Sequence, residues 1–210
     1  MPKTLRHLIA RFSSVLCLSF AICCLSASYA LEITKPAQRI VSLLPSLTET
    51  VCALGACNRL VGVDRYSNWP ESIAQLPRMG GGIDPNIESI VALKPDLVLM
   101  ANSARGVERL RSLGLTVLTL EPKNYTDIQN ALGVVAKALG LPAKNSDGVW
   151  LAMNHEIDEI ANSIPQYAKS QRVYFEVSSV PFGASESSFI GETLKRLGAK
   201  NILSSAVGQF

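Results

Sequence analysis

Residues 39–55 read RIVSLLPSLTETVCALG, and this stretch decides the fold class. Residues 39–44 are mainly β-branched and aliphatic, which is typical of a strand buried on both faces of a parallel sheet. Pro45 begins a second pattern, in which Ser46 and Glu49 have the spacing of a helix capping box ahead of an apolar helix. A buried strand that leads directly into a helix is the repeating unit of an α/β protein.

The same alternation of strand and helix continues to about residue 141. Lys94-Pro95 ends one helix, because the residue before a proline avoids the helical conformation. The last helix of this region is expected to be capped by Thr126 and to end at Gly140. Strands are predicted at residues 60–63, 96–100 and 116–120, and helices at 86–93, 107–113 and 126–139. We therefore predict that residues 37–141 form an α/β lobe whose parallel sheet is covered on both faces.

A long helix and a second α/β unit follow. Apolar residues at near-helical spacing predict a helix over residues 146–164, so the connecting segment is assigned to residues 143–165. Residues 171–210 hold one predicted strand, 172–177, and one predicted helix, 189–197. Because so small a sheet cannot bury its faces, we expect this lobe to be incomplete at its C-terminal end. The predicted fold class is α/β, with two small parallel-sheet lobes joined by one long backbone helix.

Residues 1–30 have the pattern of a cleavable export signal. Three basic residues precede a short apolar run, and the small residues Ser28 and Ala30 follow it at the expected cleavage site. The apolar run is shorter than the ~20 residues that a membrane-spanning helix needs. Cys23 follows an isoleucine rather than a small residue, which argues against a lipid anchor. The signal predicts a periplasmic protein.

The net charge of +3 belongs to that signal. Among 210 residues there are 20 Lys and Arg and 17 Asp and Glu, and residues 1–30 hold three of the basic residues and no acid. The remaining chain therefore has 17 residues of each sign and is neutral. A nucleic-acid partner is not expected, because binding phosphates requires a basic patch. A hydrophobic fraction of 48% excludes a disordered chain.

Two cysteines, Cys52 and Cys57, remain after the signal is removed. In an oxidising compartment they form either a small disulfide at the end of a helix or two buried thiols. Gly55 between them permits a sharp reversal of the chain. A zinc site is not expected, because His155 is the only histidine after residue 30.

The loops after the predicted strands supply the candidate ligand-binding residues. In a parallel α/β sheet, ligands bind in the crevice at the carboxyl ends of the strands. Pro45 and Ser46 follow the first strand, and Asn102 follows the third. The loop after the second strand carries two aromatic residues. We expect Tyr66 to contact the ligand and Trp69 to pack beneath the loop.

Two further loops complete the set of candidates. Residues 80–82 are three consecutive glycines, Gly82 among them, and we interpret them as a flexible surface loop because no strand precedes them. In the second lobe, Phe182 lies between small residues and offers another aromatic surface toward a ligand.

No enzyme signature accompanies these residues. The sequence has no G-x-S-x-G nucleophile elbow, no Walker loop and no G-x-G-x-x-G after a strand. His155 lies on a charged helix without a nucleophilic partner, which is typical of a solvated side chain. We therefore predict a protein that is not an enzyme; a secreted α/β hydrolase is the least favoured alternative.

Four segments together resemble a known family. Residues 39–55, residues 60–72 (LVGVDRYSNWPES), residues 87–100 (IESIVALKPDLVLM) and residues 110–122 (LRSLGLTVLTLEP) are similar to substrate-binding proteins of ABC importers for cobalamin and iron-siderophores. These receptors have two lobes joined by one rigid helix. The resemblance extends over residues 37–210 and is greatest to the cobalamin-binding receptors.

The resemblance implies roles for individual residues. Pro45 and Ser46 would line the cleft, Tyr66 would pack on the corrin ligand, and Phe182 would reach in from the second lobe. Glu88 matches the surface carboxylate that docks on an arginine pocket of the membrane permease. The cleft tryptophans of the cobalamin receptors are absent, because their positions correspond to residues near Gly82 and Ala101.

The resemblance also implies the partners. We expect a monomeric periplasmic receptor that captures cobalamin or a related metal chelate, holds no cofactor of its own, and delivers the ligand to an ABC permease and its ATPase. The alternatives are a receptor for an iron-siderophore or for haem, and an inactive, truncated receptor.

Overall fold

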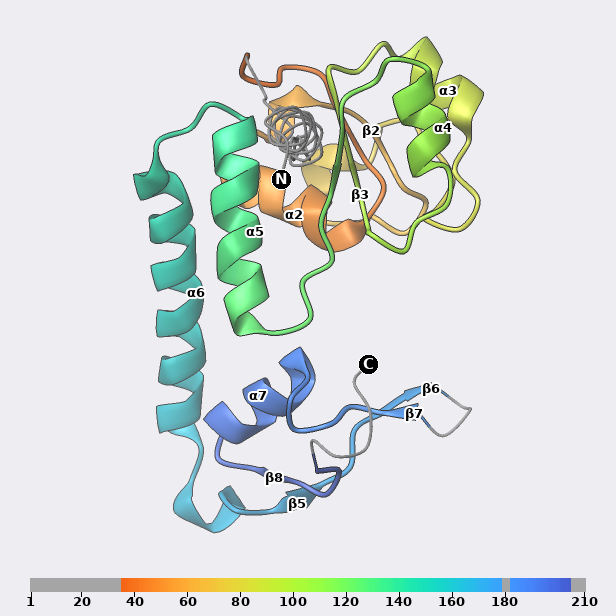
Figure 1. Ribbon diagram of the computed structural model, residues 1–210. Helices are drawn as coiled ribbons and strands as arrows, with labels where there is room; N and C mark the ends of the chain where they lie inside the picture. Colours follow the sequence, from red (N-terminus) through yellow and green to blue (C-terminus); the bar gives the residue numbers. More distant parts are fainter. Residues whose placement is uncertain (1–34, 179–181, 205–210) are drawn as a thin grey trace, which may run out of the picture. The chain divides into compact units, whose positions relative to one another are not determined.

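The computed structural model describes residues 35–178 and 182–204. The predicted export signal lies outside these residues. In Figure 1 the chain runs from a first α/β lobe through a long helix to a second lobe. The elements in chain order, with η marking short 3-10 helices, are β1 (Ile40–Ser42), α2 (Pro45–Ala53), η1 (Cys57–Arg59), β2 (Leu60–Val63), η2 (Glu71–Ile73), α3 (Ile87–Ala92), β3 (Leu97–Met100), α4 (Val107–Ser112), β4 (Val117–Thr119), α5 (Tyr125–Ala138), α6 (Ala143–Ser163), η3 (Gln166–Ala168), β5 (Arg172–Val173), β6 (Glu176–Ser178), β7 (Phe182–Gly183), α7 (Phe189–Arg196) and β8 (Lys200–Asn201).

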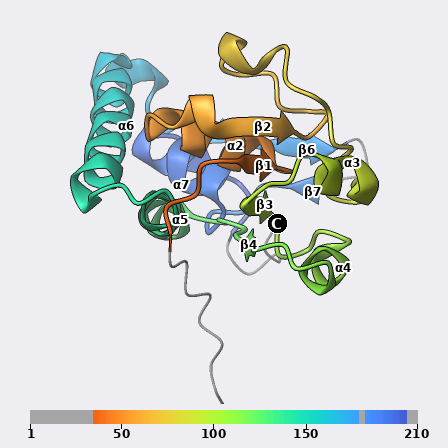
Figure 2. The same ribbon diagram turned by 90° about the horizontal axis from the view of Figure 1, so that it is seen from above.

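The first lobe is built on a parallel sheet whose strand order is β2-β1-β3-β4. Side chains of consecutive residues in the central strands point to opposite faces of the sheet and belong to two separate hydrophobic cores. Ile40 packs with α2 and α5 on one face, whereas Val41 packs with α3 and α4 on the other. Figure 2 shows these helices on the two sides of the strands. The prediction of an α/β fold with a sheet covered on both faces is confirmed.

The helix caps differ from the sequence prediction at two places. Pro45 occupies the first turn of α2, so Leu44 takes the N-cap position and Ser46 lies inside the helix. The proline fixes a helical φ at the first position, which moves the start of the helix ahead of Ser46. In α5 the cap is the Asn124 side chain, which accepts a hydrogen bond from the N–H of Asp127, and Thr126 lies within the helix. The predicted capping box at Ser46 and the predicted Thr126 cap are therefore wrong.

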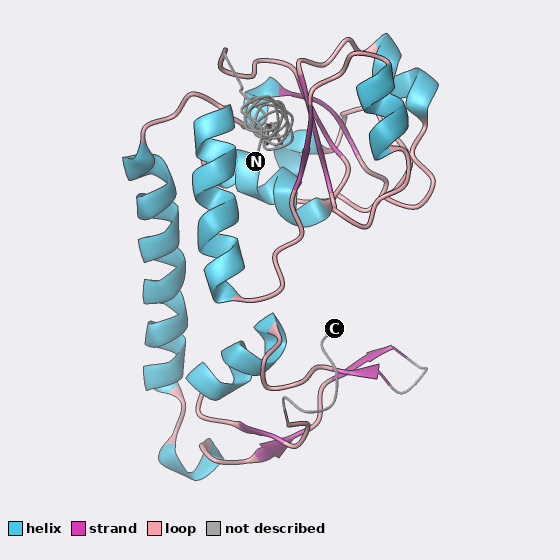
Figure 3. Ribbon diagram, in the orientation of Figure 1, coloured by secondary structure: helices cyan, strands magenta, loops and turns pink. Residues whose placement is uncertain are grey.

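The backbone helix α6 packs along α5, as Figure 3 shows. Val149 and Trp150 of α6 join the core of the first lobe. Farther along, Leu151 and Ile160 are exposed. The helix is therefore attached to the first lobe through one face of its first half.

The second lobe contains two small sheets in the described residues. β5 pairs with β8 in parallel, and β6 pairs with β7 in an antiparallel hairpin. The predicted single strand over residues 172–177 is divided, because β8 pairs only with Arg172 and Val173 and the chain then leaves that ladder. The short strands and the half-exposed side chains of Tyr174, Phe175 and Val177 show little burial in this part of the lobe.

Cys52 and Cys57 form a disulfide bond that joins α2 to η1. Gly55 lies between them with a φ of +84°, the left-handed conformation that lets the chain reverse after the helix. Of the two states left open by the sequence, the structure has the disulfide. Within residues 35–178 and 182–204, none of the helices combines the length and the apolar character of a membrane span.

Replacing both cysteines with serine is expected to lower the free energy of unfolding by about 2 kcal/mol, the loop-closure contribution of a crosslink this short. The measurement is urea unfolding followed by circular dichroism, on a chain that begins at Leu31 so that the signal cysteines are absent. The unmutated chain in reducing buffer should lose the same amount. Equal unfolding midpoints for the oxidised and the serine-substituted chains would contradict a stabilising disulfide.

Candidate functional site

The candidate site lies at the carboxyl edge of the sheet. Because all strands of the first lobe are parallel, the loops after β1, β2, β3 and β4 emerge at the same edge. The chain reverses its direction of winding between β1 and β3, since β2 lies on one side of β1 and β3 on the other. Such a switch point is where open α/β sheets bind ligands. Pro45, Ser46, Tyr66 and Asn102 all belong to these loops or to the helix start that follows β1.

A buried polar network holds the loop after β2 in place. The carboxylate of Asp64 is buried and accepts hydrogen bonds from the N–H of Tyr66, at 2.9 Å, and from the hydroxyl of Ser67. The Ser67 hydroxyl also lies 3.0 Å from Oγ1 of Thr48 on α2. The guanidinium of Arg78 donates to the backbone carbonyls of Ser67 and Asp64. Because buried polar groups are costly when unpaired, this network specifies one conformation of the loop.

That conformation exposes both aromatic side chains of the loop. Tyr66 is 66% exposed and Trp69 is 65% exposed. The prediction that Trp69 packs beneath the loop is wrong, because the inward positions are taken by Ser67 and by Ile73, which is 1% exposed. Sequence reasoning missed Trp69 as a surface residue because the pairing of Ser67 with Asp64 and Thr48 is a tertiary contact.

The glycine loop packs against the Tyr66 loop. Gly81 is buried, and a Cβ atom there would lie 3.3 Å from Cε2 of Tyr66. The N–H of Arg65 donates to the carbonyl of Gly80, and the N–H of Arg105 donates to the carbonyl of Gly82. Arg65 also forms an ion pair with Asp84. The glycine loop is therefore held against Tyr66 by backbone hydrogen bonds. These contacts correct its interpretation as a flexible surface loop.

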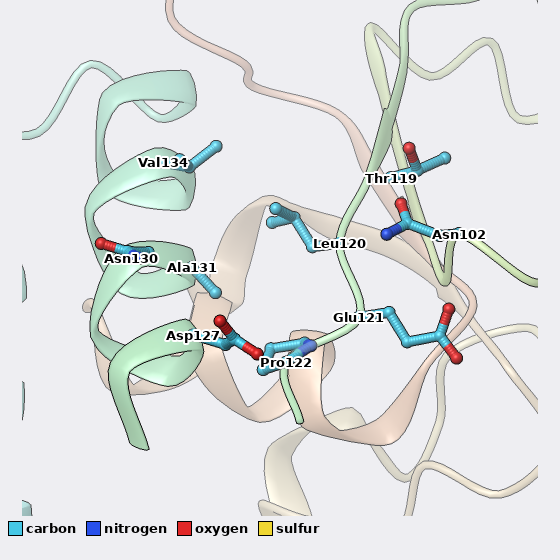
Figure 4. A pocket seen from close by; sticks show the side chains of 9 residues that line it. All are labelled: Asn102, Thr119, Leu120, Glu121, Pro122, Asp127, Asn130, Ala131 and Val134. Carbon is cyan, nitrogen blue, oxygen red and sulfur yellow. The ribbon is translucent and has the colours of Figure 1, made fainter. Parts of the chain in front are cut away.

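A polar hollow of about 330 Å³ lies beside the ends of β3 and β4. Figure 4 shows Asn102 and Glu121 on one side, with Asp127 and Asn130 on α5 across from them, and the carboxylate of Glu121 points away from α5. Glu121 accepts two hydrogen bonds from Ser103, one from the N–H and one from the hydroxyl, each 3.0 Å long. The loop that carries Asn102 is thus tied to the end of β4.

Ser46 helps to line a second hollow, of about 430 Å³. Its lining is mostly apolar and comes from α2, α5, α6 and α7; its members include Leu47, Leu132, Met153 and Phe189. Ser46 itself is exposed at its rim. The site therefore has a polar side near Asn102 and an apolar side near Ser46.

The other predicted residues lie apart from this edge. Phe182 belongs to the β7 strand of the second lobe and is 47% exposed. Glu88 is exposed in the first turn of α3, next to the Asn86 cap. His155 on α6 is exposed and lies 4.0 Å from Glu159. In the part of the chain that the structure describes, no group of three or more His, Cys, Asp or Glu side chains is arranged to hold a metal ion.

Two α/β lobes joined by a single long helix, with candidate ligand contacts at the strand ends of the first lobe, define the class of two-lobed solute receptors. The family model for "periplasmic binding protein" matches residues 40–210, and the chain belongs to that family. This is a family of substrate-binding proteins rather than enzymes, which confirms the prediction that the chain is not an enzyme.

The relatives agree with this assignment. The chain is 30% identical to an uncharacterized ABC transporter substrate-binding lipoprotein of Bacillus subtilis, over 84% of this chain and 59% of the relative. It is 31% identical to a vitamin B12-binding protein of Yersinia pestis, over 81% of this chain and 62% of the relative. The chain thus spans about 60% of the length of the curated relatives that it matches.

Solved structures show the same fold. A possible iron-binding periplasmic protein of Staphylococcus epidermidis has a TM-score of 0.72 at 27% identity, covering 83% of this chain and 70% of that one. The periplasmic vitamin B12-binding protein of Vibrio cholerae has a TM-score of 0.65 at 26% identity, over 83% and 69%. A periplasmic heme-binding protein of Pseudomonas aeruginosa reaches 0.69 at 26%, over 80% and 63%.

Replacing Asp64 with asparagine is expected to lower the free energy of unfolding by about 1–3 kcal/mol, because it removes one of the two buried acceptors and leaves a hydrogen-bond partner unpaired. Urea unfolding measures the change. The matched control is Asp84→Asn, whose carboxylate is 60% exposed and for which a loss below about 1 kcal/mol is expected. If the two variants were equally stable, Asp64 would not anchor the loop.

Proposed function

We propose that this chain is the solute-binding component of an ABC importer that captures a metal chelate with a broad, flat ring, with cobalamin as the favoured ligand. The single observation that supports the proposal is the pair of exposed aromatic side chains, Tyr66 and Trp69, on a loop held from below by buried hydrogen bonds. Exposed aromatic rings on a rigid support bind flat apolar surfaces with little loss of conformational entropy.

The exposed indole of Trp69 could replace the cleft tryptophans that the cobalamin receptors have and this chain lacks. Gly82 and Ala101 supply no ring at those positions, whereas Trp69 supplies an indole in the same loop as Tyr66. Ser46, after β1, and Asn102, after β3, follow this loop in turn along the edge of the sheet, because the strand order is β2-β1-β3-β4. A ligand that has a macrocyclic face and polar amide arms matches such a surface, because the rings contact the face and the polar groups bond the arms.

A haem or another ferric chelate is the second candidate. It is supported by the exposed phenol of Tyr66, since a tyrosine oxygen is one of the protein ligands that bind haem iron. The similar structures include both heme-binding and vitamin B12-binding proteins. Phe182 is proposed to contact either ligand from the second lobe.

Delivery of the ligand requires a membrane partner. We propose that the chain is exported to the periplasm by residues 1–30, acts there as a monomer, and docks on an ABC permease through Glu88. The exposed carboxylate of Glu88 in the first turn of α3 is accessible to a cationic pocket. The permease and its ATPase then move the ligand across the inner membrane, and the receptor itself carries out no covalent chemistry.

Isothermal titration of the purified chain with cyanocobalamin, haemin and a ferric siderophore tests the ligand assignment. We expect cyanocobalamin to bind. Binding of haemin alone would support the second candidate. A folded chain, by circular dichroism, that binds none of the three would contradict the proposal and favour an inactive receptor.

Replacing Tyr66 or Trp69 with alanine is expected to raise the dissociation constant of the bound chelate about tenfold, because each change removes one stacking surface. The matched control is Tyr167→Ala, an aromatic residue that is 82% exposed on η3. Titration calorimetry measures all three. Equal losses in the control and in the two loop variants would show that these rings have no specific role.

Replacing Glu88 with alanine is expected to leave the affinity for the chelate unchanged and to reduce its uptake by whole cells. The readouts are calorimetry on the purified variant and growth of cells that depend on import of the chelate. Glu156→Ala, an exposed glutamate on α6, serves as the control that should affect neither. Loss of affinity in Glu88→Ala would assign this residue to ligand binding instead of docking.

A further inference from the structure

The first turns of two helices, one in each lobe, meet at a joint that the sequence did not reveal. An α-helix leaves the N–H groups of its first turn without partners inside the helix. In α5 the N–H of Asp127 is bonded by its own cap, Asn124, and in α7 the N–H of Gly191 is bonded by its own cap, Ser188. The first N–H of each helix still needs an acceptor.

The N-terminal segment of each helix supplies the hydrogen-bond acceptor for the first N–H group of the other helix. The N–H of Tyr125, the first residue of α5, donates to the Glu192 carboxylate of α7 at 2.9 Å. The N–H of Phe189, the first residue of α7, donates to the carbonyl of Lys123 just ahead of α5, also at 2.9 Å. The capping is therefore reciprocal. The negative charge of Glu192 also lies at the positive end of the α5 dipole, which adds to the stability of the contact.

Tyr125 extends the joint through its side chain. Its hydroxyl lies 3.0 Å from Oγ1 of Thr193, and its ring packs against Phe189 with 5.3 Å between centroids. On the other side the ring meets Trp150 of α6 edge to face, at 6.2 Å. One residue thus contacts the backbone helix and the second lobe together.

Arg196, one turn farther along α7, connects the same three helices. Its guanidinium donates to the side-chain oxygen of Asn154 and to the carboxylate of Asp158, both on α6 and both at 2.6 Å. Its Cζ atom lies 5.2 Å from the centroid of the Tyr125 ring, within range of a cation–π contact. The hydrogen bond to Asp158 raises the pKa of Arg196 above its ordinary value.

Apolar packing around the joint is incomplete beside Phe189. Between α2 and α7, the hollow of about 430 Å³ that is lined by Leu47, Met153 and Phe189 leaves a gap beside the contact. Because a gap provides no packing energy, the placement of α7 on the first lobe depends on the polar contacts more than it would in a filled interface.

We propose that Glu192 and Arg196 are positioning residues, which hold the second lobe on the first through reciprocal capping of α5 and α7. The consequence for ligand affinity rests on the function proposed above, because a ligand bound between two lobes needs both in place. Loosening the joint lowers the fraction of binding-competent molecules, and the apparent affinity falls by the same factor.

Hydrogen exchange of the purified chain tests the joint without any ligand. In Glu192→Ala, exchange of the Tyr125 amide in the first lobe should become about fivefold faster, the factor expected for loss of one helix cap. Exchange in β1 and β3 should be unchanged. Glu192→Gln keeps a side-chain oxygen as acceptor and should restore most of the protection. Glu186→Ala, which removes the same charge from an exposed position of the second lobe, is the matched control.

Two further measurements separate positioning from general stability. The variant Glu192→Ala/Arg196→Ala should show a larger radius of gyration by small-angle scattering, and Arg196→Ala alone should show part of that increase. If the unmutated chain binds cyanocobalamin, Glu192→Ala should bind it more weakly, by at most about fivefold. Unchanged exchange at Tyr125, or faster exchange spread evenly over the sheet, would overturn the proposal. Absence of ligand binding in the unmutated chain would contradict only the proposed function.

Discussion

The structure depends on one constraint, which is that a parallel sheet with apolar residues on both faces needs helices on both faces. Ile40 and Val41 are adjacent in the sequence and enter opposite cores, as do Leu97 and Val98. Helices α2 and α5 cover one face, and α3 and α4 cover the other. The strand ends are then the part of the sheet that can carry exposed functional groups, and the loops with Ser46, Tyr66, Trp69 and Asn102 lie there.

The two polar networks of this protein have different tasks. The network of Asp64, Ser67 and Thr48 lies inside the first lobe and holds one loop so that its aromatic rings face solvent. The network of Glu192 and Arg196 joins α7 of the second lobe to α5 of the first lobe and to the backbone helix α6. Both networks order the chain before any ligand binds, and preorganisation of this kind lowers the entropic cost of binding.

Much of the fold follows from local patterns in the sequence. The strand at Leu60–Val63 and the helices that begin at Val107 and Phe189 lie where apolar periodicity and glycine signals predict them. Errors arose where two local signals competed or where a partner distant in the sequence set the length of an element. Ser46 has the residue type of a cap, but Pro45 fixes the backbone one position earlier. The strand predicted over residues 172–177 is divided because its partner β8 is short, and strand length depends on a neighbour that is distant in the sequence.

The sequence was sufficient to predict which loops form the candidate site, but not which side chains of those loops are exposed. The rule that ligands bind at strand ends is sufficient to group Pro45, Ser46, Tyr66 and Asn102 at one edge of the sheet. The exposure of Trp69 was not predictable, because it depends on which residue of the loop finds a buried partner.

The α/β class, the single long helix and membership of the periplasmic binding protein family could all be inferred from the amino-acid sequence, because periodicity and short motifs are local properties. Three features became visible only in the tertiary structure: the packing of the glycine loop beside Tyr66, the exposure of Trp69, and the reciprocal capping of α5 and α7. Each of these depends on a hydrogen bond or a close approach between residues far apart in the chain, for which residue type and spacing carry no local signal.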